Sequence, residues 1–169
     1  MTLFQNRYRA ESHRLPGYDY GSNGMYFVTI CTKNREHYFG EILDGQLITT
    51  AIGQIAIDYW MEIPKHYPFV SIESFVLMPD HLHGILAFDR PNKTDWTSNK
   101  FGPQTQNLGA VIRGFKSTLK RFANQNIIPF EWQRNYHDRI VRSEQELERI
   151  INYIEANPEE WEKVIKGRD

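Results

Sequence analysis

The sequence predicts an α+β sandwich, in which helices pack on a largely antiparallel sheet, because strand-type segments alternate with amphipathic helical ones. Residues 24–32, 70–78 and 81–88 are rich in β-branched and aromatic side chains, which is typical of strands. The last two are joined at Pro79-Asp80, and Asp44-Gly45 lies between two short apolar pairs, which is a strong hairpin signal. Short connections of this kind favour antiparallel pairing.

Two helices are predicted from apolar residues that recur every three or four positions. The first carries Ile52, Ile55, Tyr59 and Ile63, and Pro64 should end it. The second has an apolar side made of Leu108, Val111, Ile112, Phe115, Leu119 and Phe122. Its basic residues fall on the opposite side of the helix, so the segment should bury one face and expose the other.

A third helix is expected after a short strand around residues 138–141. Ser143, followed three residues later by Glu146, forms a capping box that opens it. Its apolar stripe consists of Leu147, Ile150, Ile151 and Ile154. Each of the three helices therefore has one face to bury against the sheet.

The length of 169 residues suits one domain over 1–169, with an N-terminal arm (1–22), a polar loop expected to be mobile (89–105) and a last short helix (158–169). Apolar residues make up 40% and charged residues 24%, which argues against intrinsic disorder. No apolar run approaches the roughly 18 residues of a membrane span, and the start lacks a signal-peptide pattern. One cysteine, Cys31, excludes an intramolecular disulfide. We expect a cytoplasmic protein that does not bind membranes.

The formal net charge of −1 hides an uneven distribution of charge. Residues 100–121 contain no Asp or Glu, whereas residues 143–169 carry eight acids and four bases. Such a division is expected if one face meets a polyanion, although a basic helix face is often simply solvated. The candidate phosphate contacts are Arg113, Lys116, Lys120 and Arg121, Arg7, Arg9 and Arg14 in the arm, and Arg139 and Arg142.

The motif His81-Leu82-His83 is the most specific chemical feature of the sequence. On a strand the two histidines project from one face with Cα atoms about 7 Å apart, so their imidazoles can converge on one metal ion. Leu82 then faces the core, and Gly84 leaves room on the core side for a packed helix. The alternative is two incidental histidines on a half-exposed strand. Imidazole by itself suits zinc, copper, iron or nickel better than magnesium.

Two tyrosines are candidate functional residues. Tyr153 and Asn157 are spaced i, i+4 on one flank of the apolar stripe of the third helix. A metal-activated tyrosine oxygen could attack phosphorus, but the helical pattern by itself favours Tyr153 as a residue at the edge of the core. Asn157, which precedes Pro158, could instead cap a short final helix. Tyr136 begins a cluster that contains Arg139 and reads either as a supporting site or as an exposed edge strand.

Taken in order, these motifs resemble a known family. His81-Leu82-His83 after a Met-Pro turn resembles the HUH motif of the small single-tyrosine transposases. It is followed by Phe115-Lys116-Ser117, Trp132-Gln133-Arg134, Asp138-Arg139-Ile140-Val141-Arg142 and Asn152-Tyr153-Ile154-Glu155-Ala156-Asn157-Pro158. The last segment is similar to the tyrosine helix of the REP-associated tyrosine transposases. The resemblance covers roughly residues 24–161.

The resemblance implies a ferredoxin-like core and a divalent ion, magnesium or manganese, between His81, His83 and Asn157. It implies Tyr153 as nucleophile, with Tyr136 as the fallback, in a metal-dependent enzyme that cleaves and rejoins single-stranded DNA next to hairpins through a 5′-phosphotyrosine link. The partner would be single-stranded or hairpin DNA, and the enzyme a monomer or a homodimer. Two alternatives are a hairpin-binding module without catalysis and a zinc hydrolase that uses a bound water.

Overall fold

The computed structural model describes residues 3–4, 8–9, 24–89 and 107–167. Within the expected arm it describes two short strands, β1 (Leu3–Phe4) and β2 (Tyr8–Arg9), which pair antiparallel. The rest of the arm and the expected loop after Asp89 lie outside the described residues. Within the described ranges, no helix combines the length and the apolar character that a membrane span requires.

A four-stranded sheet forms the centre of the fold, with strand order β6-β7-β3-β8 and antiparallel pairing throughout. The four strands are β3 (Gly24–Cys31), β6 (Val70–Met78), β7 (His81–Phe88) and β8 (His137–Ile140). All four coincide with predicted strands to within a residue at each end. The β6–β7 hairpin places the two histidines at the start of a central strand.

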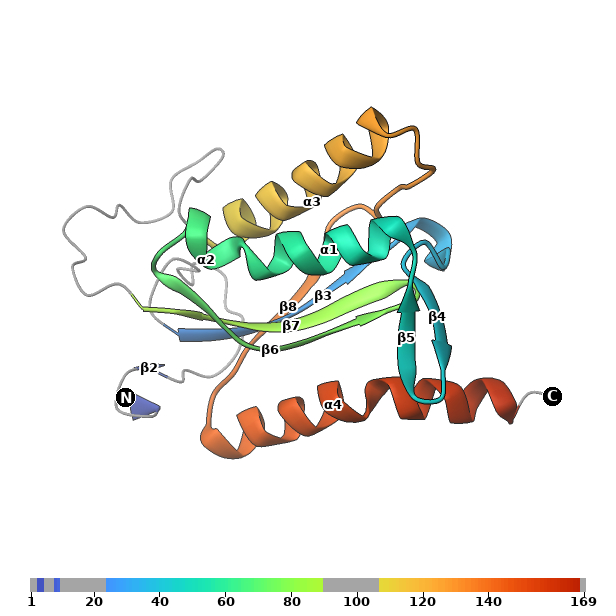
Figure 1. Ribbon diagram of the computed structural model, residues 1–169. Coiled ribbons are helices and arrows are strands. Elements are labelled where there is room, and N and C mark those ends of the chain that lie inside the picture. Colours follow the sequence, from blue (N-terminus) through green and yellow to red (C-terminus); the bar gives the residue numbers. More distant parts are fainter. Residues whose placement is uncertain (1–2, 5–7, 10–23, 90–106, 168–169) are drawn as a thin grey trace.

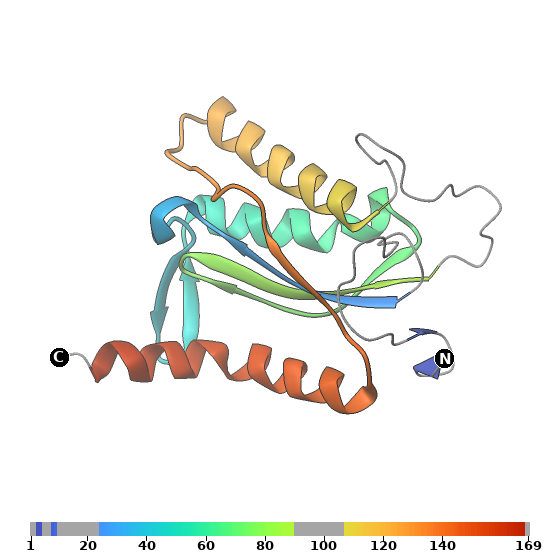
Figure 2. The same cartoon turned by 180° about the vertical axis from the view of Figure 1, so that it is seen from behind.

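Helices cover both faces of this sheet (Figures 1 and 2). One face carries α1 (Ala51–Met61), the short α2 (Ile63–His66) and α3 (Leu108–Gln125), and the other face carries α4 (Glu144–Lys166). This arrangement confirms the predicted ferredoxin-like α+β sandwich. Pro64 does not end α1 directly: α1 stops at Met61, and Pro64 sits in the first turn of α2, where its missing N–H is not needed.

Strand β7 separates two apolar clusters. Leu82, Leu86 and Phe88 belong to the cluster under α1 and α3, whereas Ile85 and Ala87 belong to the cluster under α4. The alternation of side chains along a strand therefore turns His81 and His83 toward α4 and Leu82 toward the main core.

Gly84 lies directly under the buried indole of Trp60 from α1. A Cβ atom at position 84 would overlap this indole, so the absence of a side chain lets α1 pack closely on β7. The expectation that Gly84 makes room for a helix is confirmed.

A second hairpin, β4 (Gly40–Leu43) and β5 (Gln46–Thr49), extends beside the C-terminal part of α4 (Figure 1). Its turn residues Asp44 and Gly45 have φ values of 51° and 73°, as the predicted two-residue hairpin turn requires. Their backbone N–H groups donate to the Glu162 carboxylate of α4 at 3.1 and 2.9 Å. The hairpin therefore holds the end of α4 beside the sheet.

Helix α4 is continuous through Pro158, which corrects the expectation of a separate final helix over 158–169. Asn157 consequently does not cap a helix. A proline inside a helix removes one backbone hydrogen bond, and the contacts of Glu162 with the hairpin and of Trp161 with His37 favour continuation of the helix beyond it. The start is as predicted: Ser143 Oγ accepts the N–H of Glu146 at 3.1 Å.

Candidate active site

The two histidines of β7 lie side by side beneath α4. Their side chains are almost fully buried, and the ring centroids are 4.5 Å apart. The sequence predicted this pairing from the two-residue spacing alone. Neighbouring side chains form hydrogen bonds with the two rings and determine which ring nitrogens can bind a ligand.

Asp80 fixes the orientation of His81. Its Oδ1 lies 2.6 Å from Nδ1 of His81, and its Oδ2 accepts a hydrogen bond from Nε of Arg35 at 2.8 Å. An ionised carboxylate only accepts, so Nδ1 of His81 donates to it, and in a neutral ring the lone pair is then on Nε2. Burial alone would raise the pKa of the Asp80 carboxyl, but the hydrogen bonds from His81 and Arg35 hold this pKa below its ordinary value.

Arg35 reaches Asp80 from an unusual backbone conformation. Its φ is 56°, in the left-handed region that residues with a side chain rarely adopt. Besides Asp80, its guanidinium donates to Sγ of Cys31 at 3.1 Å. These contacts compensate the backbone strain and join the segment after β3 to the histidine pair.

Thr29 lies beside Nδ1 of His83, as Asp80 lies beside Nδ1 of His81. The two residues face each other across β3 and β7, and Oγ1 of Thr29 lies 2.8 Å from Nδ1 of His83. The Phe27 ring stacks on the imidazole with centroids 5.4 Å apart. Burial, together with the neighbouring charges of His81 and Arg35, lowers the pKa of His83 to about 3. His83 is therefore a neutral imidazole at ordinary pH.

Tyr153 extends from α4 over this pair. Its phenolic oxygen lies 3.5 Å from Nε2 of His83, and its ring makes an edge contact with Phe27. The residue is 53% exposed although its helical neighbours Ile150 and Ile154 are buried. An accessible phenol next to a buried imidazole nitrogen can act on a substrate that arrives from solvent.

The site fits a divalent ion that is bound in part by the neutral imidazole nitrogens of His81 and His83. Each Nδ1 has a hydrogen-bond partner, which leaves Nε2 of His81 and of His83 for a metal, and such supported imidazoles are typical of metal ligands. Among the described residues, no three His, Cys, Asp or Glu side chains gather at one point. The amide of Asn157 lies one turn after Tyr153 on α4, and its nitrogen donates to the Tyr153 carbonyl at 3.4 Å.

Tyr136 lies elsewhere in the fold. It is half-buried and packs against the cluster under α1 and α3, so it does not share the α4 face with the histidine pair. A Cβ built on Gly109 of α3 would lie 3.6 Å from its hydroxyl. Of the two tyrosines, Tyr153 is the one placed beside His83.

Two predicted DNA contacts on α3 are held by contacts within the protein. Lys116 Nζ donates to the carbonyls of Gln133 and Asn135, both at 2.9 Å. Lys120 Nζ donates to the Phe130 carbonyl at 2.6 Å and pairs with a glutamate next to it. Both ammonium groups therefore bind the segment between α3 and β8. Arg113 and Arg121 are exposed on the same helix, across the sheet from Tyr153.

Two other basic candidates, Arg139 and Arg142, lie nearer α4. Arg139 on β8 forms an ion pair with the buried Glu146 at 2.7 Å, and Arg142 is half-buried just before α4 begins. Arg9 is described only as part of β2, and Arg7 and Arg14 lie outside the described residues.

Sequence reasoning missed the residues that surround the histidines. Asp80 directly precedes His81, and this adjacency was an available signal. Thr29 and Arg35 come from another part of the chain, and no local spacing indicates that they meet β7. Their roles follow from strand pairing and from a long-range ion pair.

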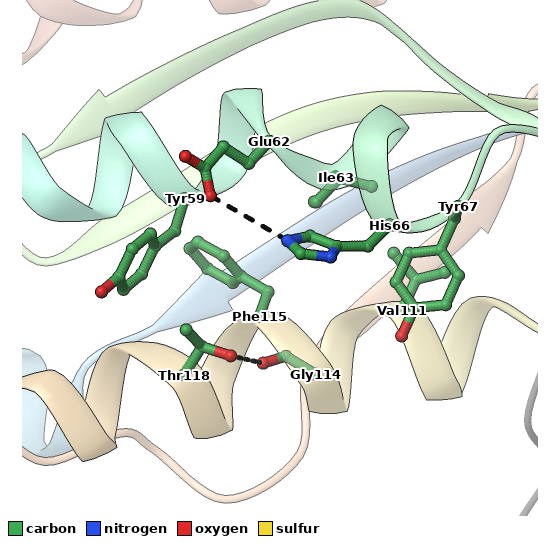
Figure 3. Close-up of a pocket in the computed structure, with 9 residues that line it drawn as sticks. All are labelled: Tyr59, Glu62, Ile63, His66, Tyr67, Val111, Gly114, Phe115 and Thr118. Carbon is green, nitrogen blue, oxygen red and sulfur yellow. Dashed lines mark hydrogen bonds and ion pairs between the residues drawn. The ribbon is translucent and has the colours of Figure 1, made fainter.

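Two cavities flank the sheet. One, of about 670 Å³, opens beside Tyr153 between α4 and the segment that carries Arg35 and His37. The other, of about 290 Å³, lies across the sheet between α1, α2 and α3, where Tyr59, His66 and Tyr67 project from α1, α2 and the turn after it (Figure 3). Only the first adjoins the histidine pair.

The chain is similar to two curated proteins of Haemophilus influenzae. No protein-family model matches the chain. A protein of Haemophilus influenzae described as uncharacterized is 37% identical over 161 residues, which cover 90% of this chain and 89% of that protein. A second protein of that organism, whose name assigns it provisionally to the REP-associated tyrosine transposases, is 24% identical over 83% of this chain and 73% of its own length.

A solved structure shares the fold. It is that of a REP-associated tyrosine transposase bound to a REP hairpin, with a TM-score of 0.59 and 17% sequence identity, over 89% of this chain and 73% of that chain. At this identity the likeness concerns the fold.

Proposed function

We propose that the chain is a REP-associated tyrosine transposase, as a 24% identical relative and the shared fold support, and that it cleaves and rejoins single-stranded DNA beside a hairpin. The observation that carries the proposal is the position of Tyr153, whose exposed phenol lies 3.5 Å from Nε2 of the buried His83. The related solved structure contains a REP hairpin, which supports hairpin DNA as the substrate.

The proposed reaction is an in-line displacement at phosphorus. The Tyr153 oxygen forms a bond to the 5′-phosphate, the bond from phosphorus to the 3′ oxygen breaks, and that oxygen takes up a proton. The phenolic proton leaves to solvent, to which Tyr153 is open. Attack by another 3′-hydroxyl reverses the step and rejoins DNA without an external energy source.

His81, His83 and Asn157 are the proposed ligands of the Mg²⁺ or Mn²⁺ ion. Bound to both Nε2 atoms and the Asn157 oxygen, the ion would supply positive charge that polarises the scissile phosphate. Asp80 and Thr29 hold Nδ1 of the two imidazoles, and Nε2 of His83 then lies 3.5 Å from the Tyr153 oxygen. A zinc hydrolase is less well supported, because the described residues offer no third His, Cys, Asp or Glu at this point.

DNA would approach from the α4 side, where Tyr153 is exposed. We assign the nearest backbone contacts to Arg139 and Arg142, with Arg7, Arg9 and Arg14 of the arm as further contacts. Arg113 and Arg121 remain candidates for a part of the hairpin that extends past the sheet. The ammonium groups of Lys116 and Lys120 would have to exchange internal hydrogen bonds for phosphates.

Covalent trapping tests the proposal. The wild type, Tyr153→Phe and Tyr136→Phe are incubated with a pooled library of end-labelled hairpin oligonucleotides, with Mn²⁺ or chelator, and run on denaturing gels. We expect a Mn²⁺-dependent protein–DNA band in the wild type and in Tyr136→Phe that is absent from Tyr153→Phe. A band that survives in Tyr153→Phe would contradict the assignment. Cleavage without a band would favour a hydrolase, and hairpin binding without cleavage would favour a binding module.

A further inference from the structure

The cavity beside Tyr153 continues along α4 toward the C-terminal end of that helix. Its volume of about 670 Å³ is within the range of small-molecule sites, and it is the larger of the two cavities described above. Tyr153 lines one end and Trp161, two turns later on α4, lies farther along it. Tyr153 and Trp161 are eight helical residues apart, which is about 12 Å. A group bound at Trp161 would therefore lie close to the phosphate that Tyr153 attacks.

Trp161 forms an aromatic wall of the cavity. Its indole lies against His81, with centroids 6.2 Å apart, and against His37, at 5.5 Å. Nε1 of the indole is buried and has no hydrogen-bond partner among the described residues, so ring contacts alone hold it there. The apolar side chains of Val164 and Ile165 complete this part of the lining and remain 54% and 42% exposed. Exposed apolar surface beside a cavity is typical of a binding site.

The charges of the lining argue against a phosphate as the occupant. The Arg35 guanidinium is already paired with Asp80 at 2.8 Å, and His37 is paired with Glu41 at 3.0 Å. Glu160 adds a carboxylate to the lining, and its partner Lys163 lies outside it. A phosphate would meet this carboxylate, and among the described residues of the lining each cation is already paired. An uncharged planar ring can stack on an indole and form hydrogen bonds with polar groups at its edge.

We propose that this cavity binds the base of the nucleotide that adjoins the scissile phosphate, with Trp161 as the stacking platform. The proposal rests on the proposed function, because it takes Tyr153 as the point at which the DNA strand is attacked. It adds a binding site for a single unpaired base, separate from recognition of the hairpin. Cleavage should then weaken when the nucleotide at that position lacks its base.

Binding of single nucleotides tests the site without any need for cleavage. The ¹⁵N-labelled protein is titrated with the four deoxynucleoside 5′-monophosphates and, separately, with 2-deoxyribose 5-phosphate, which lacks a base. We expect the Trp161 indole signal, assigned with Trp161→Phe, and the Ala156 backbone amide signal to shift with at least one nucleotide and not with the sugar phosphate. Equal shifts with the sugar phosphate, or none with any nucleotide, would overturn the proposal.

Variants locate the binding. Ala156→Leu narrows the cavity from an exposed helical position and should not disturb folding. Base stacking is worth roughly 1–3 kcal/mol, so Trp161→Leu should weaken nucleotide binding at least about fivefold, and Trp161→Phe should weaken it less. His66→Gln, in the cavity of Figure 3, is the control and should leave binding unchanged. Unchanged binding in both Ala156→Leu and Trp161→Leu would place the nucleotide elsewhere and overturn the proposal.

The two proposals fail separately. If the wild type forms a covalent DNA adduct but no nucleotide shifts Trp161, the base site is wrong and the proposed reaction stands. If nucleotides shift Trp161 in the wild type and Ala156→Leu abolishes the shift, the base site is supported even where Tyr153 forms no adduct.

Discussion

Oδ1 of Asp80 lies 2.6 Å from Nδ1 of His81, and both side chains are buried. The same carboxylate accepts hydrogen bonds from Arg35, so its charge is balanced on both sides. This contact occupies Nδ1 of His81 and leaves Nε2 for a metal ion, and the first prediction follows from it.

Asp80→Asn should weaken binding of Mn²⁺ by about 10- to 100-fold, which is the usual effect of removing a carboxylate that supports a metal-binding histidine. The amide can still accept from Nδ1, but its NH₂ group cannot accept from Arg35, so the orientation of both partners is lost. Electron paramagnetic resonance of free Mn²⁺ measures the affinity. Asp58→Asn, on an exposed position of α1, is the matched control and should bind Mn²⁺ like the wild type. Equal affinity in all three proteins would contradict the role of Asp80.

His83 should make the metal-free protein sensitive to acid. Its pKa is about 3 in the folded protein and about 6.5 when unfolded, so between these values the unfolded chain binds the additional proton. The free energy of unfolding should therefore fall as the pH drops from 6.5 toward 3, by up to about 1.4 kcal/mol per pH unit from this group.

Urea unfolding in the presence of chelator at several pH values measures this slope. His83→Gln should remove the contribution of His83 and flatten the profile. The exposed His66, changed to Gln, should leave the profile as in the wild type. Identical slopes in the wild type and His83→Gln would show that His83 does not retain a depressed pKa.

Glu162→Gln should loosen the C-terminal part of α4. The carboxylate accepts two backbone N–H groups from the Asp44-Gly45 turn, and a neutral amide accepts them less strongly. Hydrogen exchange of the α4 amides after Pro158 should accelerate, while those before Tyr153, over the apolar cluster, keep their protection. Glu159→Gln, exposed on the same helix, serves as the control. Unchanged exchange after Pro158 would mean that the hairpin does not hold the helix.

Gly84→Ala should destabilise the fold by about 1–3 kcal/mol, because the new methyl group overlaps the buried Trp60 indole. Thermal unfolding followed by circular dichroism measures the change. Gly109→Ala on α3 is the comparison: a Cβ there meets only ordinary contacts, and alanine favours a helix, so this variant should be as stable as the wild type or more so. A Gly84→Ala protein with the wild-type melting temperature would show that α1 can move away from β7.

Local pattern was sufficient for the framework and for part of the candidate site. Alternation along β7 places His81 and His83 on one face and Leu82 on the other, since the side-chain period of a strand is two whatever surrounds it. The capping box at Ser143 likewise depends on neighbours three residues apart. Tyr153 was predicted on the flank of the apolar stripe for the same reason.

Tertiary structure decided what these side chains meet. Thr29 and Arg35 reach the histidines through strand pairing and a long-range ion pair. Lys116 donates hydrogen bonds to backbone carbonyls of a segment that comes later in the chain. Helix α4 continues through Pro158 beside contacts with a hairpin more than a hundred residues earlier. Periodicity is a property of the backbone and can be read locally, whereas the partner of a charged or polar group depends on which segments the fold brings within a few ångströms.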